Sequence, residues 1–196
     1  MLALDKVAEY QNGLALQKFR PKDNEEPLPI VKIAQLKSGV ATWQELASPS
    51  VKPECIIDNG DVVFSWSGSL MVDIWCGGKA ALNQHLFKVT SESYPKWFYL
   101  YSTKKHLTDF QRIAADKAVT MGHIKRSHLT EALCAIPSEK ILDIGSSILS
   151  PMIESVVSNE LESHILAELR DTLLPKLISD ELPIKNAEKF LEQAGV

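Results

Sequence analysis

The stretch 60–70, which reads GDVVFSWSGSL, decides the centre of the fold. Its apolar run lies between two glycines, which predicts a buried strand, and the strand ends in small hydroxyl side chains around a tryptophan. Two interpretations of this ending are open. Ser65, Trp66 and Ser67 are presented to a ligand at the strand end, or Trp66 is a core residue and the serines merely end the strand.

The neighbouring segments predict further strands. Alternating apolar and polar residues predict a strand over 29–36, followed by a turn. Residues 56–57 and 62–64 flank Asp-Asn-Gly and predict two strand pieces joined by a tight turn. Residues 70–75 and 82–89 flank Gly-Gly and predict a second hairpin-like pair. The first part of the chain is therefore expected to contain a twisted β-sheet.

Helices are expected beside these strands. Apolar residues recur at helical spacing over 95–115, whereas 119–136 resembles a loop with short strands. After Pro137 the pattern changes to apolar residues at steps of three and four, separated by Glu and Ser, which predicts one or two long amphipathic helices. The fold class is thus mixed α+β, followed by a long helix of the coiled-coil type.

The end of the chain divides further. Gly145 and Pro151 argue against one unbroken helix, and Ser150 followed by proline predicts a helix start at that point. Pro175 should end or kink the helix. We therefore expect a domain over 1–137, a helical region over 138–179 and a tail over 180–196.

The long helix is expected to need a partner. Its apolar stripe meets no second helix of comparable length in its own chain, so a second copy pairing about a two-fold axis is the simplest cover. The alternative is that the helix folds back across its own domain. The candidate interface residues are Ile148, Met152, Val156, Leu161, Ile165, Leu169 and Leu173.

Charge is divided unequally along the 196 residues. The net charge is −4, but 1–137 carries 16 Lys and Arg against 14 Asp and Glu, a net +2, whereas 138–196 carries 5 against 11, a net −6. Within the first part, 96–126 holds seven basic and two acidic residues, a local +5. That segment is either a polyanion-facing surface or an ordinary solvated helix face.

The composition excludes several classes of protein. Three cysteines lie far apart without metal-ligand spacing, which predicts neither a zinc site nor a disulfide framework. We see no signal peptide and no apolar run of membrane-spanning length, so a cytoplasmic protein without a membrane partner is expected.

No catalytic motif is found in the sequence. Ser67 lacks the flanking glycines of a hydrolase elbow, and neither a phosphate-binding glycine loop nor a zinc-protease motif occurs. The five histidines have no regular ligand spacing. We therefore expect no catalytic residue, no metal, no cofactor and no enzymatic activity.

Several segments resemble the specificity (DNA-recognition) subunits of type I restriction-modification systems. Residues 58–69 and 82–87 resemble the central strands of the family's target recognition domain. Residues 166–179, LAELRDTLLPKLIS, are similar to the end of its conserved helical region, and 4–13 is similar to its usual opening. This chain departs from the full-length pattern of two recognition domains and two helical regions, because it holds one of each.

The resemblance implies a function and partners. It implies a non-catalytic subunit that reads double-stranded DNA and directs adenine-N6 methylation by a modification (methyltransferase) subunit and cleavage by a restriction subunit. The competing hypothesis is a coiled-coil assembly or antitoxin-like protein-interaction module. The candidate DNA-binding residues are Lys18, Arg20, Ser65, Trp66, Ser67, Lys104, Lys105, His123, Lys125 and Arg126.

Overall fold

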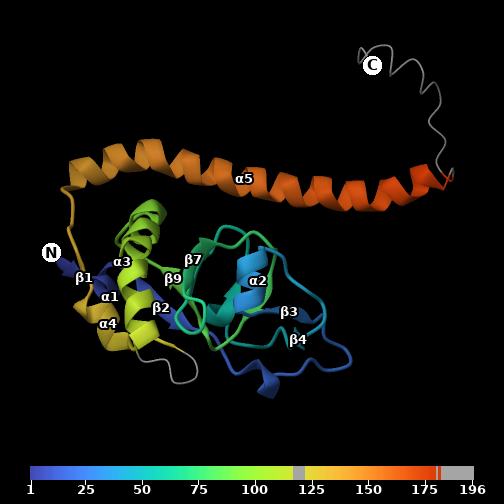
Figure 1. Ribbon diagram of the computed structural model, residues 1–196, viewed down its shortest axis with the longest axis horizontal. Helices are drawn as coiled ribbons and strands as arrows, with labels where there is room; N and C mark the ends of the chain where they lie inside the picture. Colours follow the sequence, from blue (N-terminus) through green and yellow to red (C-terminus); the bar gives the residue numbers. More distant parts are fainter. Residues whose placement is uncertain (117–121, 180, 182–196) are drawn as a thin grey trace, which may run out of the picture. The chain divides into compact units, whose positions relative to one another are not determined.

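The computed structural model describes residues 1–116, 122–179 and 181, and the chain divides into two compact units, Met1–Val157 and Ser158–Val196. The elements of the described residues follow in chain order (Figure 1). They are β1 Leu2–Ala3, α1 Leu4–Val7, β2 Glu9–Asn12, the 3-10 helix η1 Leu16–Lys18, β3 Leu28–Val31, α2 Ile33–Ser38, β4 Leu46–Ala47, η2 Pro53–Cys55, β5 Ile56–Ile57, β6 Val62–Ser65, β7 Met71–Ile74, β8 Ala80–Leu82, β9 Leu86–Thr90, α3 Lys96–Asp116, α4 Arg126–Glu131, β10 Leu133–Cys134 and α5 Glu139–Ile178.

The quoted strand is the centre of an antiparallel sheet with the order β2-β9-β6-β7. All four residues of β6 are buried because both faces of the strand are covered. Phe64 packs on one face, where its ring stacks on Phe110 of α3 at 5.9 Å between centroids. Val63 points to the other face, into a cluster that contains Trp75 and Leu86. The predicted buried strand is therefore confirmed.

A second sheet has the order β4-β3-β8-β5, in which β3 and β8 run parallel. Its apolar residues form a separate small cluster around Ile30 and Ala81. The strand order in the two sheets shows that two expected hairpins are wrong. β5 pairs with β8 and not with β6, and β7 and β9 both pair with β6, which lies between them.

Two short helices occupy segments where strands or loops were expected. The strand over 29–36 ends at Val31, and α2 follows because the side chain of Gln35 accepts a hydrogen bond from the backbone N–H of Lys32 at 3.2 Å and caps the helix. α2 ends at Ser38 and is followed by Gly39, whose φ of 73° suits glycine. α4 lies within the region expected to be loop and strand. The helix expected over 95–115 is confirmed as α3, which packs against β7 and β9.

The expected break in the long helix is wrong, since α5 runs without interruption through Gly145 and Pro151. Gly145 has a packing role, because a Cβ atom there would lie 2.6 Å from a ring carbon of Trp97. The indole N–H of Trp97 also donates to Ser146 Oγ at 3.0 Å. These contacts hold the first half of α5 on α3, and they outweigh the weak helical propensity of glycine.

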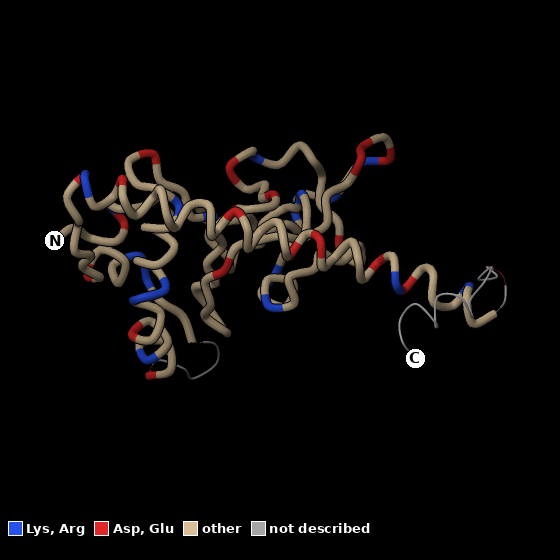
Figure 2. The backbone as a smooth tube through the Cα atoms, turned by 90° about the horizontal axis from the view of Figure 1, so that it is seen from above, with Lys and Arg blue, Asp and Glu red and all other residues tan. Residues whose placement is uncertain are grey.

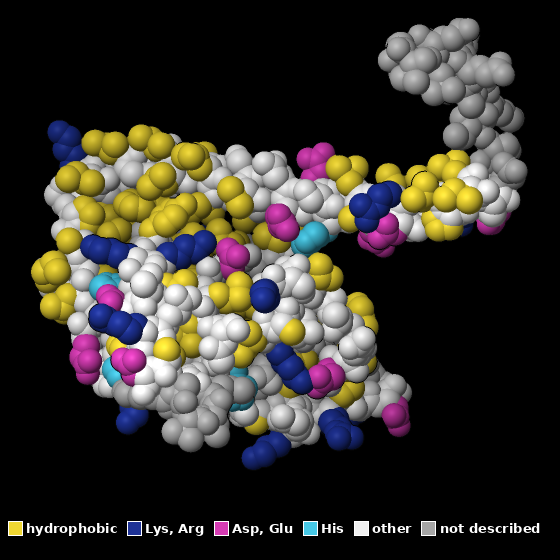
Figure 3. Space-filling view, viewed as in Figure 1, with side chains coloured by type: hydrophobic (Ala, Val, Ile, Leu, Met, Phe, Trp, Pro, Cys, Tyr) yellow, Lys and Arg dark blue, Asp and Glu magenta, His cyan; other side chains and the backbone are white. Residues whose placement is uncertain are grey.

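The first half of α5 therefore has two apolar faces. Leu142 and Ile153 pack into the main core, so the compact unit continues to Val157, beyond the domain end expected at 137. Thus part of the helix does fold back on its own domain. A second row remains exposed; it consists of Ile141, Ile144, Ile148, Met152 and Val156, which are 52–60% exposed. Hydrophobic side chains gather over this half of α5 and the start of α3 (Figure 3).

By length and composition, α5 could also cross a membrane, contrary to the expectation that no such run exists. One helix of this kind is weak evidence for a span. Its first half hydrogen-bonds to α3, and the whole helix carries seven acidic and three basic residues (Figure 2). Charged side chains are costly inside a bilayer, so these charges disfavour burial of the whole helix in a membrane.

Candidate nucleic-acid interface

The end of β6 does not present free hydroxyls. Ser65 is fully buried, and its Oγ donates to the carbonyl oxygen of Ser67 at 3.0 Å. Ser67 is 2% exposed, and its Oγ lies 2.9 Å from Nδ1 of His85. Of the two interpretations, the one in which Ser65 and Ser67 are presented to a ligand does not fit this burial, because both hydroxyls make hydrogen bonds inside the protein.

Trp66 is partly buried and packs on the main core. Its ring centroid lies 5.8 Å from those of Phe87 and His85, and the ring of His123 meets it edge-on at 6.3 Å. The indole Nε1 is buried and has no hydrogen-bond partner within the described part of the chain. The core interpretation of Trp66 therefore fits the structure better than the ligand-facing one.

The segment that follows the undescribed residues 117–121 crosses this strand end. The backbone N–H of Ile124 donates to the carbonyl of Trp66 at 3.0 Å, and that of Gly68 donates to the carbonyl of Gly122 at 2.8 Å. These hydrogen bonds place the exposed His123 beside Ser67, at the end of β6. The buried strand end therefore serves as a support for the segment that holds the next two basic residues.

Lys125 and Arg126 open α4 and differ in their surroundings. The guanidinium of Arg126 donates to the carbonyl of Tyr10 at 3.0 Å and lies 5.3 Å above the Phe87 ring. Lys125 has an exposed side chain that makes no ion pair with any described residue. Arg126 is thus a positioned cation, and Lys125 is an exposed cation of the kind that contacts phosphates.

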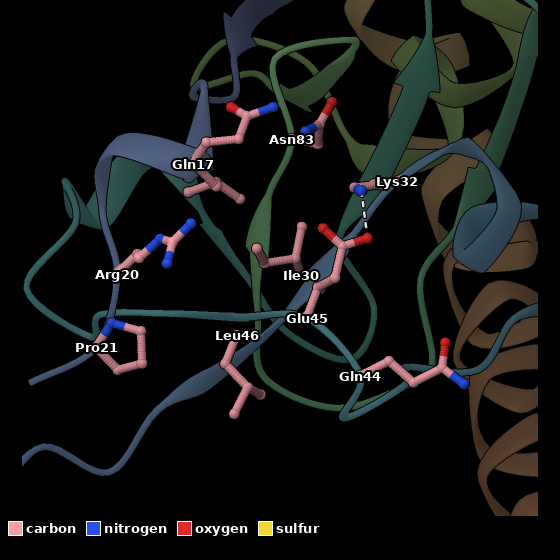
Figure 4. A pocket seen from close by; sticks show the side chains of 10 residues that line it. Gln17, Arg20, Pro21, Ile30, Lys32, Gln44, Glu45, Leu46 and Asn83 are labelled. Atoms are coloured by element: carbon pink, nitrogen blue, oxygen red, sulfur yellow. Dashed lines mark hydrogen bonds and ion pairs between the residues drawn. The ribbon is translucent and has the colours of Figure 1, made fainter. Parts of the chain in front are cut away.

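Lys18 and Arg20 lie in and just after η1, and both are exposed. Neither makes an ion pair inside the described ranges. Arg20 lines a pocket of about 510 Å³ (Figure 4). In the space-filling view, several Lys and Arg side chains and a histidine lie along the lower edge of the molecule, with fewer Asp or Glu side chains beside them (Figure 3). Uncompensated positive charge of this kind attracts a phosphate backbone.

Lys104 and Lys105 have other neighbours. Lys104 Nζ lies 3.6 Å from Asp73 of β7, an ion pair that offsets its charge. Lys105 lines a pocket of about 220 Å³ whose other walls are mainly aromatic and apolar; they are Trp97, Phe98, Tyr101, Ser102, Cys134 and Ala135. Lys117, part of the +5 segment, is outside the described residues. The structure therefore gives α3 a weaker cationic surface than its sequence indicated.

Some residues of this region were not among the sequence candidates. His85 supports Ser67 and Trp66, yet a single histidine in a turn gives no signal of that role. The Asn83 side chain accepts the backbone N–H of His85 at 3.2 Å, a common use of Asn in a turn. Gln17 lines the pocket beside Arg20. Only the fold brings these residues together.

Two buried titratable groups of the region have raised pKa values. Burial raises the pKa of the Tyr10 phenol, whose oxygen lies 2.6 Å from Thr103 Oγ1. Burial likewise raises the pKa of the Cys134 thiol, which keeps it protonated. No group of three metal-ligating side chains occurs among the residues the structure describes.

Comparison with known proteins identifies the family. The model of the type I restriction modification DNA specificity domain matches residues 1–170. The EcoBI specificity subunit of Escherichia coli is 26% identical over 142 residues, which are 69% of this chain and 28% of that protein. The MjaIX specificity subunit of Methanocaldococcus jannaschii is 24% identical over 173 residues, 81% of this chain and 38% of that one. This chain thus spans well under half the length of both relatives.

A solved structure shares the fold. The S subunit of a type I restriction-modification system from M. genitalium aligns with a TM-score of 0.56 and 16% identity, over 97% of this chain and 47% of that one. The mixed sheets followed by a long helix agree with this architecture, and the family match covers most of the chain. This protein belongs to the family of the type I restriction modification DNA specificity domain.

Proposed function

We propose that this chain reads a DNA sequence as the recognition component of a type I restriction-modification complex and has no catalytic role of its own. Family membership is the observation that carries the proposal. Three of the candidate cations, Lys18, Arg20 and Lys125, are exposed and make no ion pair among the described residues, and they support the proposal, as does the positioned Arg126. Phosphate contacts of this kind fix a protein on the duplex, and base contacts then specify the sequence. The cytoplasmic location expected from the sequence remains part of the proposal.

The salt dependence of binding tests this proposal. Neutralising phosphates releases counterions, so the logarithm of the association constant should fall linearly with the logarithm of salt concentration, with a slope of about −0.9 per phosphate contacted. We expect a slope that corresponds to several contacts for a mixed duplex. The competing protein-interaction module would bind neither duplex nor heparin with such a slope.

We further propose that α5 pairs with the α5 of a second copy. The exposed rows support this, because Ile165, Leu166, Leu169 and Leu174 are 50–65% exposed in the second half of the helix. The other two interface candidates, Leu161 and Leu173, are half-buried. An antiparallel pair centred on Asn159 would set Ile141 against Leu177, Ile144 against Leu174 and Met152 against Leu166.

Helix geometry favours this register. Five turns of helix take about 18 residues, so Ile141, Asn159 and Leu177 fall on one line along α5. An asparagine at the centre of an apolar seam is a common way to specify register. Two copies would read an inverted repeat of one half-site.

Engineered disulfides test the register. The native cysteines Cys55, Cys76 and Cys134 are buried, so an introduced cysteine would be the accessible thiol. We expect Asn159→Cys to form a disulfide-linked dimer under mild oxidation, because its two copies would meet at the axis. Ser158→Cys is the matched control, since it points about 100° away around the helix. Equal cross-linking of both variants would contradict the register.

The same helix is proposed to dock the modification subunit, through which the restriction subunit joins. Its net charge of −4 disfavours a DNA phosphate backbone and leaves protein as the partner. Since the compact unit ends at Val157, a chain shortened there keeps its core. We expect this truncation to lose co-purification with a modification subunit while retaining weak DNA binding. Unchanged co-purification would contradict the role of the second half of α5.

A further inference from the structure

The pocket beside Arg20 has the construction of a ligand site. Its volume of about 510 Å³ falls in the usual range of about 300–1,000 Å³ for small-molecule sites. The floor is apolar, with Leu16 and Ile30 only 1% and 6% exposed. Polar groups surround this floor (Figure 4). The lining residues with polar side chains are Gln17, Arg20, Lys32, Gln44, Glu45 and Asn83.

The polar side chains of the pocket differ in how much of their charge or hydrogen-bonding capacity is left for a ligand. Lys32 and Glu45 lie side by side on one wall of the pocket, where they form an ion pair and largely neutralise each other. Arg20 makes no ion pair within the described ranges and remains the available cation. The oxygen of the Asn83 amide is held by the backbone N–H of His85, which leaves its NH₂ group as a donor.

Two amides lie at the same end of the pocket. Figure 4 shows the side chains of Gln17 and Asn83 near each other, with Arg20 further along the wall. Asn83 is 5% exposed, so its amide is fixed in place, whereas Gln17 is exposed and can adjust. Paired amide groups match the donors and acceptors on the edge of a nucleobase, and an arginine matches a phosphate.

The concave shape decides which part of DNA can enter. Base edges of an intact duplex are recessed in grooves, where only projecting side chains reach them. A concave site with a buried apolar floor can receive only a group that projects from the nucleic acid. A phosphate alone would leave the apolar floor uncovered, whereas an unpaired base would cover it.

We propose that this pocket binds a single nucleotide, with the phosphate at Arg20 and the edge of an unpaired base at the amides of Gln17 and Asn83. A base displaced from the duplex and a free mononucleotide share this chemistry. The first source rests on the proposed DNA-reading function, and the second does not.

Duplexes with one bulged nucleotide separate these sources. Binding of the full chain is measured by fluorescence anisotropy on a fully paired duplex and on four duplexes that differ only in one bulged base. We expect about tenfold or greater preference for at least one bulged duplex, because the cost of unpairing is already met. Gln17→Ala should abolish most of that preference. Lys37→Ala, an exposed cation of α2 outside the pocket, is the matched control and should retain it.

Free dAMP, dCMP, dGMP and dTMP form the second arm, with binding followed by calorimetry. Equal affinity for bulged and paired duplexes, or a preference that survives Gln17→Ala, would overturn the pocket and leave the proposed function standing. Gln17-dependent binding of a monophosphate without any duplex binding would support the pocket and overturn the proposed function. Binding of neither ligand would overturn both.

Discussion

The substitution Gly145→Ala tests how α5 is attached, because helical propensity predicts that it raises the free energy of unfolding, whereas packing predicts that it lowers it. In a free helix, alanine is more favourable than glycine by about 1 kcal/mol. In this fold, a Cβ atom at residue 145 would lie 2.6 Å from a ring carbon of Trp97. Overpacking of this kind costs about 1–3 kcal/mol. We therefore expect Gly145→Ala to lower the free energy of unfolding by up to about 2 kcal/mol.

A double-mutant cycle isolates the contact. In a Trp97→Val background the clash is gone, so Gly145→Ala should stabilise by about 1 kcal/mol. Urea unfolding followed by circular dichroism gives the four free energies. The midpoint of thermal unfolding should shift by about 2–4 °C for each kcal/mol of change in stability, which provides an independent check on the urea values. Stabilisation by Gly145→Ala in both backgrounds would refute the packing of α5 on α3.

Four other predictions concern charge, acid dependence and association. Lys125→Glu should weaken duplex binding and flatten its salt dependence with little change in stability, whereas the control Lys37→Glu should change neither the binding nor its salt dependence. Arg126→Ala should reduce both duplex affinity and stability, because the Arg126 guanidinium donates to the carbonyl of Tyr10 and lies over the Phe87 ring. Hydrogen bonds, of which that from Ser48 has the largest effect, lower the pKa of the Glu25 carboxyl. The ionised carboxylate therefore stabilises the fold above pH 4.5, the ordinary value, and this stabilisation is lost as the pH falls through the lowered pKa. Glu25→Gln should remove this part of the acid dependence of unfolding in pH-jump experiments. Leu166→Asp should give monomers in light scattering over a concentration series, and a wild-type chain that stays monomeric would contradict the dimer.

Local patterns in the sequence were sufficient for the elements with continuous periodicity. β6 and α3 were predicted because an apolar run and a helical repeat are local features. The partners of each strand depend on the whole fold, which is why 56–57 and 62–64 were wrongly joined as one hairpin. Short helices such as α4 hold too few residues for a periodic signal.

The candidate site was predictable only in part. Basic residues and a histidine outside the predicted strands could be chosen from the sequence, and Lys18, Arg20, His123 and Lys125 are exposed. The burial of the serines was not predictable, because it depends on His85 from a distant turn and on the segment that crosses the strand end. Likewise, the continuity of α5 through a glycine depends on a tryptophan from another helix.

Selection from a pool of randomised duplexes, with the full chain and a modification subunit present, tests the central claim of DNA reading most directly. The proposed function predicts that repeated rounds at moderate salt enrich one sequence, and the proposed dimer predicts that this sequence is an inverted repeat with a fixed gap. Enrichment of a single half-site would retain DNA reading and reject the dimer. A pool that stays random after repeated rounds, although the protein is folded and bound to its partner, would contradict the claim that this chain reads DNA.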